Sequence, residues 1–127
     1  MPPTETNKNV SILVIDDEPS VGDALRLVLE AKGYEVVVVT NGGDGIEQWR
    51  KRCFGLLIVD LVLSDTYGLQ IIKHIHQHQP EVPIVLITGH AGPQVFAEAR
   101  KLGAIGTLAK PFQPAEILAL ITAALAE

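Results

Sequence analysis

Short apolar segments rich in β-branched residues alternate along this chain with segments that repeat apolar residues at helical spacing. The short segments have the length and composition of buried strands, and they occupy residues 10–15, 35–39, 56–59, 84–87 and 105–109. The helical segments begin near Pro19, Ile46, Leu69, Val95 and Pro114. Strict alternation of this kind predicts a single doubly wound α/β domain, in which one parallel sheet has helices on both faces.

The length of the chain fits one domain of this type. It has 127 residues, of which 47% are hydrophobic, and this is enough apolar material for a real core. We expect a flexible polar tail over residues 1–9 and the domain itself over residues 10–127. Residues 41–45 are rich in turn-forming types, so we expect a turn there and a short helix over residues 46–52.

The charge balance and the absence of certain segments restrict the partners and the compartment. Fifteen acidic and ten basic residues give a net charge of −5, which argues against a direct nucleic-acid partner. No apolar run approaches the roughly 18 residues of a membrane span, and the N-terminus does not resemble a secretory signal. The one cysteine, Cys53, excludes an intramolecular disulfide framework. These features predict a cytoplasmic domain that does not enter a membrane.

Polar residues stand where the predicted strands end. Asp16 and Asp17 follow the first strand, Asp60 ends the third, Thr88 ends the fourth, and Lys110 follows the fifth. Ligands of open parallel sheets bind beyond the carboxyl ends of the strands. If the first and third strands are neighbours, three carboxylates, a hydroxyl and an ammonium group therefore converge at one edge of the sheet.

Three close carboxylates repel one another, and this repulsion indicates the chemistry of the edge. Two unit charges 4 Å apart cost about 4 kcal/mol at an effective dielectric constant of 20, so the group needs a cation or a proton. Oxygen ligands without histidine or cysteine suit Mg²⁺. With Lys110 as a second positive charge, the arrangement suits a phosphoryl group that arrives at a carboxylate nucleophile.

Each of these residues also has an ordinary structural explanation when it is taken alone. Asp16 and Asp17 are suited to cap the helix that follows them, and Asp60 is suited to an exposed loop. Thr88 before glycine is common in turns, and a Lys-Pro pair has little meaning by itself. The order in which all of them follow successive strands favours the functional interpretation.

Four segments carry a resemblance to a known family: ILVIDDE (12–18), LLIVDLVLSDTYG (56–68), IVLITGH (84–90) and GAIGTLAKPF (103–112). Over about residues 10–126 the chain resembles the receiver domain of two-component response regulators. The resemblance implies a flavodoxin-like, five-stranded sheet in the order 2-1-3-4-5. It also implies a signalling domain that is not otherwise an enzyme and catalyses only its own phosphotransfer and dephosphorylation.

The resemblance also implies roles for residues of the acidic group. Asp60 is expected to be the phosphoacceptor. Asp17, Asp60 and the backbone carbonyl of Val62 are expected to bind Mg²⁺ directly, and Asp16 is expected to act through a water molecule.

Further residues are expected to hold the phosphoryl group or to transmit its presence. The Thr88 hydroxyl and the Lys110 ammonium are expected to contact phosphoryl oxygens. The bond between Lys110 and Pro111 is expected to be cis, and Thr107 takes the position at which many members carry a tyrosine or phenylalanine switch. The donor is expected to be a phosphohistidine on a sensor histidine kinase or a histidine phosphotransfer protein. The recipient of the signal is expected to be a downstream protein target or an attached output domain.

Other function classes remain to be compared with this one. A receiver-like module that interacts without phosphorylation would have the same fold, and so would a receiver excised from a larger hybrid kinase or regulator. A nucleotide-binding or hydrolytic enzyme is disfavoured because no GxGxxG segment follows the first strand and no Walker loop is present.

A few residues outside this group have the chemistry for a separate role. His74 and His78 have the i, i+4 spacing of metal ligands, but without a third ligand we expect them on a solvated face. We expect Cys53 and Trp49 to be structural. Phe96 is expected to be partly exposed, either as part of an interaction surface or as a residue at the core boundary.

Overall fold

Five parallel strands form one sheet in the order β2-β1-β3-β4-β5 in the computed structural model, which describes residues 10–89 and 92–126. The strands are β1 (Ser11–Ile15), β2 (Glu35–Val39), β3 (Leu56–Asp60), β4 (Ile84–Thr88) and β5 (Gly106–Ala109). The helices are α2 (Pro19–Glu30), α3 (Gly42–Lys51), α4 (Gly68–His78), α5 (Pro93–Leu102) and α6 (Pro114–Leu125). The doubly wound fold and the strand order are confirmed. The tail predicted over residues 1–9 lies outside the described residues.

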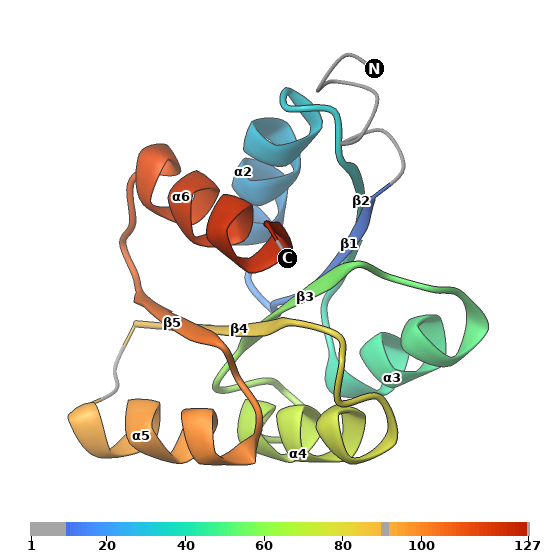
Figure 1. Cartoon of the computed structure of the whole chain (residues 1–127), viewed down its shortest axis with the longest axis vertical. Helices are drawn as coiled ribbons and strands as arrows, with labels where there is room; N and C mark the ends of the chain where they lie inside the picture. The colour runs from blue at the N-terminus through green and yellow to red at the C-terminus, as the bar shows by residue number, and fades with distance from the viewer. Residues whose placement is uncertain (1–9, 90–91, 127) are drawn as a thin grey trace.

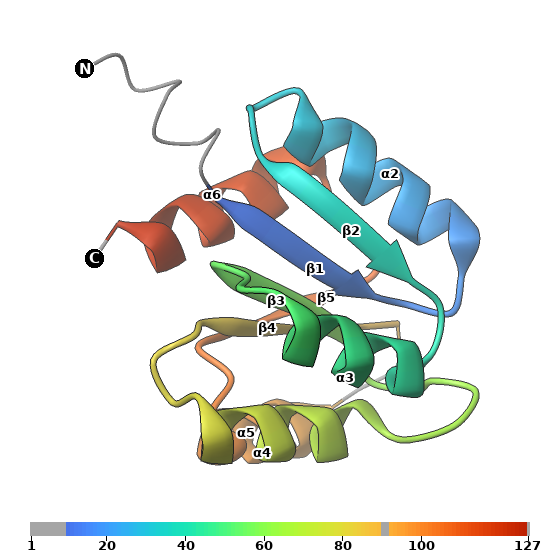
Figure 2. The ribbon, with the colours of Figure 1, turned by 90° about the vertical axis from the view of Figure 1, so that its right-hand side faces the viewer.

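The helices form two layers, one on each face of the sheet. Helices α2 and α6 lie on one side, and α3, α4 and α5 lie on the other (Figure 1). A view from the side shows β1 and β2 with their arrowheads at the same edge, where the connections that follow β1 and β3 also lie (Figure 2). Within the described segments, no helix is long and apolar enough to cross a membrane.

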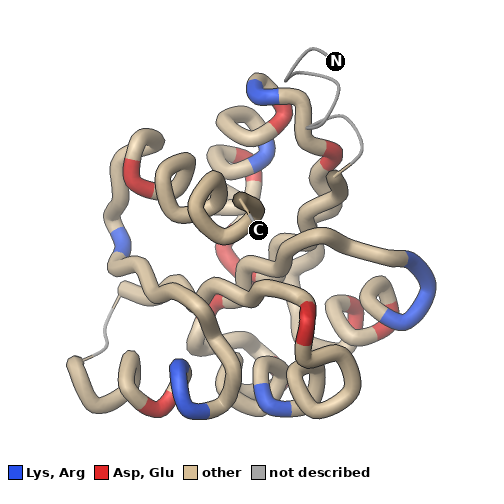
Figure 3. Tube along the Cα trace, in the orientation of Figure 1, with Lys and Arg blue, Asp and Glu red and all other residues tan. Residues whose placement is uncertain are grey.

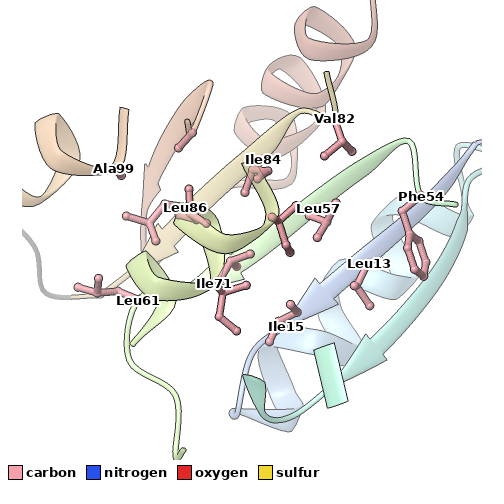
Figure 4. Close-up of a cluster of buried hydrophobic side chains, with 14 of the residues drawn as sticks. Leu13, Ile15, Phe54, Leu57, Leu61, Ile71, Val82, Ile84, Leu86 and Ala99 are labelled. Carbon is pink, nitrogen blue, oxygen red and sulfur yellow. The ribbon is translucent and has the colours of Figure 1, made fainter. Parts of the chain in front are cut away.

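Side chains alternate between the two layers along each strand and so build two cores. Ile12 and Val14 of β1 pack with α2 and α6, whereas Leu13 and Ile15 pack on the opposite side. Figure 4 shows the second cluster, where strand side chains meet those of α4, such as Ile71. Because helices cover both faces, the strands β3 and β4 are buried along their whole length, which explains their uninterrupted apolar sequence.

Helix α3 differs from the sequence-based expectation. We expected a turn over residues 41–45, but the helix already begins at Gly42. The Asn41 side chain accepts a hydrogen bond from the Asp44 N–H at 2.8 Å, and the Asp65 carboxylate accepts the N–H groups of Gly42 and Gly43 at 2.8 and 2.9 Å. These acceptors satisfy N–H groups that a helix start otherwise leaves without partners, and they offset the low helix propensity of the glycines.

Two leucines of α2 allow us to measure the contribution of the core that lies between the sheet and helices α2 and α6. Leu29 is fully buried, whereas Leu27 on the same helix is 75% exposed. We expect Leu29→Ala to lower the free energy of unfolding by about 2–5 kcal/mol, because it removes buried methyl groups and leaves a cavity. Leu27→Ala, the matched control, should change it by less than about 0.5 kcal/mol. Urea denaturation measures both values, and equal losses would contradict this assignment of the core.

Candidate functional site

Parallel pairing of β1 with β3 brings the acidic residues together. Ile15 lies opposite Val59 in the register, so Asp16 and Asp60 follow at the same level of the sheet. One carboxylate oxygen each from Asp16, Asp17 and Asp60 lies within 4.8 Å of the others. Asp16 is fully buried and Asp60 is 6% exposed, so two of the three charges are largely removed from water.

The ammonium group of Lys110 provides the positive charge of this cluster. Its Nζ lies 3.0 Å from Asp16 Oδ2, 2.9 Å from Glu18 Oε1 and 3.5 Å from Asp60 Oδ1. The main chain of Lys110 is held against β4, because its N–H donates to the Thr88 carbonyl oxygen at 2.8 Å. The peptide bond between Lys110 and Pro111 is cis, as the resemblance implied.

The protonation equilibria reflect both the burial and the crowding of the charges. Burial, followed by the negative charge of Asp16, raises the pKa of Asp60 to about 6, although Lys110 acts in the opposite direction. Burial also acts to lower the pKa of Lys110, but its contacts with Glu18, Asp16 and Asp60 outweigh burial and raise that pKa. The carboxylates therefore keep Lys110 charged, whereas one ammonium does not fully offset the repulsion at Asp60.

The loop between β3 and α4 holds Asp60 through backbone contacts. The Gly68 N–H donates to the Leu61 carbonyl oxygen at 2.6 Å, and Val62 forms a bridge with Tyr67. A Cβ atom at Gly68 would collide with the Asp60 carbonyl oxygen, so only glycine allows α4 to begin this close to the end of β3. The start of α4 thus fixes the backbone of the candidate acceptor.

Two acidic residues, one at the site and one in the loop that follows Asp60, were not singled out from the sequence. Glu18 contacts Lys110, and Asp65 ties the β3–α4 loop to the first turn of α3 through the N–H groups of Gly42 and Gly43. Those two N–H groups hold the pKa of the Asp65 carboxyl below its usual range. Glu18 could have been found from the sequence, because it is the third acidic residue of the ILVIDDE segment. No local pattern connected Asp65 to residues more than twenty positions away.

The acidic group fits a hard divalent cation. Its donors are oxygen atoms only, without histidine or cysteine, and this set suits Mg²⁺. Across residues 10–89 and 92–126, Asp16, Asp17 and Asp60 are the only group of three or more metal-ligating side chains this close together. Asp16 Oδ1 also accepts a hydrogen bond from the Glu18 N–H at 2.9 Å, and this contact stabilises the local turn. The ordinary structural role therefore involves only one of the two carboxylate oxygens of Asp16. Its other oxygen faces Lys110.

A cleft of about 770 Å³ opens over the acidic group. Residues from α2, from the strand ends and from the segment after β5 line it, and they include Val62, Thr88, Lys110 and Phe112. Thr88 is 3% exposed and Val62 is 56% exposed. Thr107 is half-buried on β5 and is not among the residues that line the cleft.

The remaining candidate residues lie outside this cleft. His74 and His78 are exposed, with ring centres 4.5 Å apart, and the edge of Trp49 packs against both. The indole N–H of Trp49 donates to Gln79 at 2.8 Å, which gives this residue a structural role, and Cys53 is exposed. Phe96 is half-buried and packs against the core on the α3, α4 and α5 side of the sheet.

Basic residues do not gather on one face of the described chain. Figure 3 shows these positions dispersed over several helices and over connections between elements, among them the segment after β5. Acidic positions are also found around the structure, and those at the sheet edge form the cluster described above.

Comparisons with known proteins agree on one family. The family model for the response regulator receiver domain matches residues 12–122. The transcriptional regulatory protein ZraR of Escherichia coli is 32% identical over 121 residues, which is 95% of this chain but only 27% of ZraR. The chain therefore spans about a quarter of that relative's length.

Solved structures give the same result. A CheY-like receiver domain protein of Methanospirillum hungatei has a TM-score of 0.89 and 27% identity, and the match covers 92% of this chain and 94% of that one. A two-component response regulator of Clostridium difficile has a TM-score of 0.90 and 26% identity, with coverage of 94% of this chain and 98% of that one.

Removal of one acidic charge should stabilise the domain. The folded-state pKa of Asp60 is raised, so its charged form destabilises the fold, and this penalty grows as the pH rises from about 4 to about 6. In EDTA, we expect Asp60→Asn to increase the free energy of unfolding by about 1–3 kcal/mol at pH 7.5, with a smaller gain at pH 5. Urea denaturation at both pH values measures the gain. The exposed Asp23→Asn is the control, and an equal gain at both pH values would contradict the prediction.

Addition of a methyl group at Gly68 should disturb the backbone of Asp60. We expect Gly68→Ala to lower the free energy of unfolding by about 1–3 kcal/mol, because the new methyl group must displace the end of β3 or the start of α4. Gly43→Ala is the matched control, since its Cβ would meet only ordinary contacts at 3.4 and 3.5 Å. Thermal or urea unfolding compares the two variants, and a Gly68→Ala protein as stable as the control would refute the steric argument.

Proposed function

The chain belongs to the response regulator receiver domain family, and we propose that it accepts a phosphoryl group on Asp60 in a two-component phosphorelay. The observation that carries the proposal is the environment of Asp60. Its carboxylate is buried at a strand end, close to Asp16 and Asp17 and 3.5 Å from the Lys110 ammonium. A carboxylate nucleophile beside a fixed cation is suited to receive a phosphoryl group.

The transfer needs little covalent chemistry from the protein. An Asp60 carboxylate oxygen attacks phosphorus in line, the new O–P bond forms, and the bond to the donor atom breaks as the donor leaves with its electron pair. Lys110 stays protonated and pairs with a phosphoryl oxygen, and the Thr88 hydroxyl donates to another. Burial and the charge of Asp16 raise the pKa of Asp60 in the absence of a cation, and a divalent cation at the acidic group would favour the ionised, nucleophilic form.

The acidic group would hold Mg²⁺ in this reaction. The proposed direct ligands are Asp17, Asp60 and the backbone carbonyl of Val62, with Asp16 acting through water. When bound, the ion supplies positive charge that offsets the carboxylates and the developing charge on the phosphoryl oxygens.

The product is an acyl phosphate, which water hydrolyses, so the modification is transient. The phosphoryl group carries about −1.5 to −2 charges, in place of the single negative charge of the Asp60 carboxylate. Movement of Thr88 toward the new oxygens would bias an existing equilibrium between two conformations, with α5, β5 and α6 as the surface that partners read. Because Thr107 takes the position of the usual aromatic switch residue, this chain would transmit the change without a rotating ring.

The partners follow from this chemistry. The donor is a phosphohistidine on a sensor histidine kinase or on a histidine phosphotransfer protein. The signal then passes to a downstream protein target or to an attached output domain. ZraR is a transcriptional regulatory protein of which this chain spans 27%, so the match is consistent with either arrangement.

Intact-mass measurement tests the acceptor directly. After incubation with acetyl phosphate and Mg²⁺, we expect the wild-type protein to gain one phosphoryl group, and we expect no gain when EDTA replaces Mg²⁺. Asp60→Asn should not gain mass, because the nucleophilic oxygen is lost. Asp23→Asn is the control, since it removes an exposed carboxylate on α2 and should behave as the wild type does.

The alternatives predict different masses. A gain that persists in Asp60→Asn would assign the acceptor to another residue. The absence of any gain in folded protein that binds Mg²⁺, with acetyl phosphate and also with a phosphorylated histidine kinase, would favour an interaction module that works without phosphorylation.

A further inference from the structure

Lys110 is held mainly by carboxylates other than the proposed acceptor. Its Nζ lies 2.9 Å from Glu18 and 3.0 Å from Asp16, but 3.5 Å from Asp60. An ammonium group has three N–H donors, so each additional strong acceptor reduces what it can offer to a phosphoryl oxygen. With Glu18 and Asp16 bound, one N–H is left for a phosphoryl group on Asp60, and a second hydrogen bond to that group requires the loss of one of these two partners.

The two shorter contacts differ in how easily they can be released. Asp16 is fully buried, and the Glu18 N–H holds its Oδ1 at 2.9 Å, so its carboxylate has no water to move into. The Glu18 side chain is 60% exposed, and its carboxylate can rotate into solvent at little cost. Glu18 is thus the partner that Lys110 can lose.

Glu18 also lies in the cleft to which the candidate acceptor is open. It lines the same cleft as Asp60, Thr88 and Lys110. At this position its negative charge repels an anionic phosphodonor as well as competing for the ammonium. Both effects act against phosphorylation, and both disappear when the charge is removed.

We propose that Glu18 is a positioning residue that restrains phosphorylation by holding the Lys110 ammonium at the cleft mouth until a phosphoryl oxygen displaces it. This inference rests on the proposed phosphorylation of Asp60 and adds a residue that sets its rate. The phosphoryl group passes to an Asp60 oxygen from the histidine nitrogen of the kinase, or from the acetate oxygen of acetyl phosphate, which keeps the electron pair of the broken bond, and Glu18 and Lys110 exchange no proton. Release of Glu18 is a rotation of an exposed side chain.

The experiment compares Glu18→Gln with the wild type at saturating Mg²⁺, with acetyl phosphate as the donor and intact mass as the readout. Glutamine keeps the size of the side chain and removes its charge. We expect the rate of phosphoryl gain to rise about threefold or more at about 0.05 M ionic strength, and the difference to shrink at about 0.5 M. Glu18→Asp keeps the charge on a shorter side chain and should show a smaller increase than Glu18→Gln.

An equilibrium readout separates positioning from a general structural effect. Beryllofluoride is an anion that mimics a bound phosphoryl group, and its binding with Mg²⁺ can be followed by NMR without any transfer. We expect Glu18→Gln to bind it more tightly by a similar factor. Glu47→Gln is the matched control, because Glu47 is an exposed α3 residue that pairs with Lys51 at 3.7 Å, away from the cleft.

The outcomes distinguish this inference from the function on which it rests. A wild type that never gains mass overturns both the proposed function and the role of Glu18. A wild type that is phosphorylated, beside a Glu18→Gln protein with an equal or lower rate, overturns the role of Glu18 alone. An equal rise in Glu47→Gln would assign the effect to net charge and would also overturn it.

Discussion

One ammonium group among four carboxylates is the interaction on which the site depends. Lys110 contacts Asp16, Glu18 and Asp60, and Asp17 completes the acidic group. These residues come from the ends of different elements and meet only because the parallel sheet brings β1, β3 and β5 to one edge. The two cores fix the strands, the strands fix the residues that follow them, and the resulting excess of negative charge leaves the edge ready for cations.

The excess of negative charge that the proposed function needs also lowers the stability of the fold. The core is built from strands buried on both faces, but the acidic edge places like charges where water cannot screen them. The raised pKa of Asp60 is the measurable sign of this conflict. A site that is fully satisfied before it binds anything would have little affinity for a cation or a phosphoryl group, so part of the stability of the fold is given up where the chemistry takes place.

Much of the architecture could be predicted from the sequence, because alternating apolar segments determine both the element types and the sheet class. The convergence of Asp16, Asp60 and Lys110 followed from the rule that strand ends meet at one edge. Contacts between distant side chains were beyond this reasoning. The start of α3 at Gly42 depends on Asp65, which lies 23 positions further along the chain. The contact between Glu18 and Lys110 depends on which way one exposed side chain turns, and no periodicity encodes that.

The close packing of Gly68 against the Asp60 carbonyl has a kinetic consequence. The backbone that carries Asp60, the candidate acceptor, is held in place, because the loop after it is bonded to Leu61 and, through Asp65, to α3. Among the described residues, the Glu18 side chain at this cleft is exposed and has freedom to change rotamer. Exposed side chains change rotamer in picoseconds to nanoseconds, whereas loops and collective movements take nanoseconds to milliseconds. If Asp60 accepts a phosphoryl group as proposed, its surroundings are therefore prepared faster than two proteins can dock, and the slow events would be encounter, bond cleavage and the later conformational response.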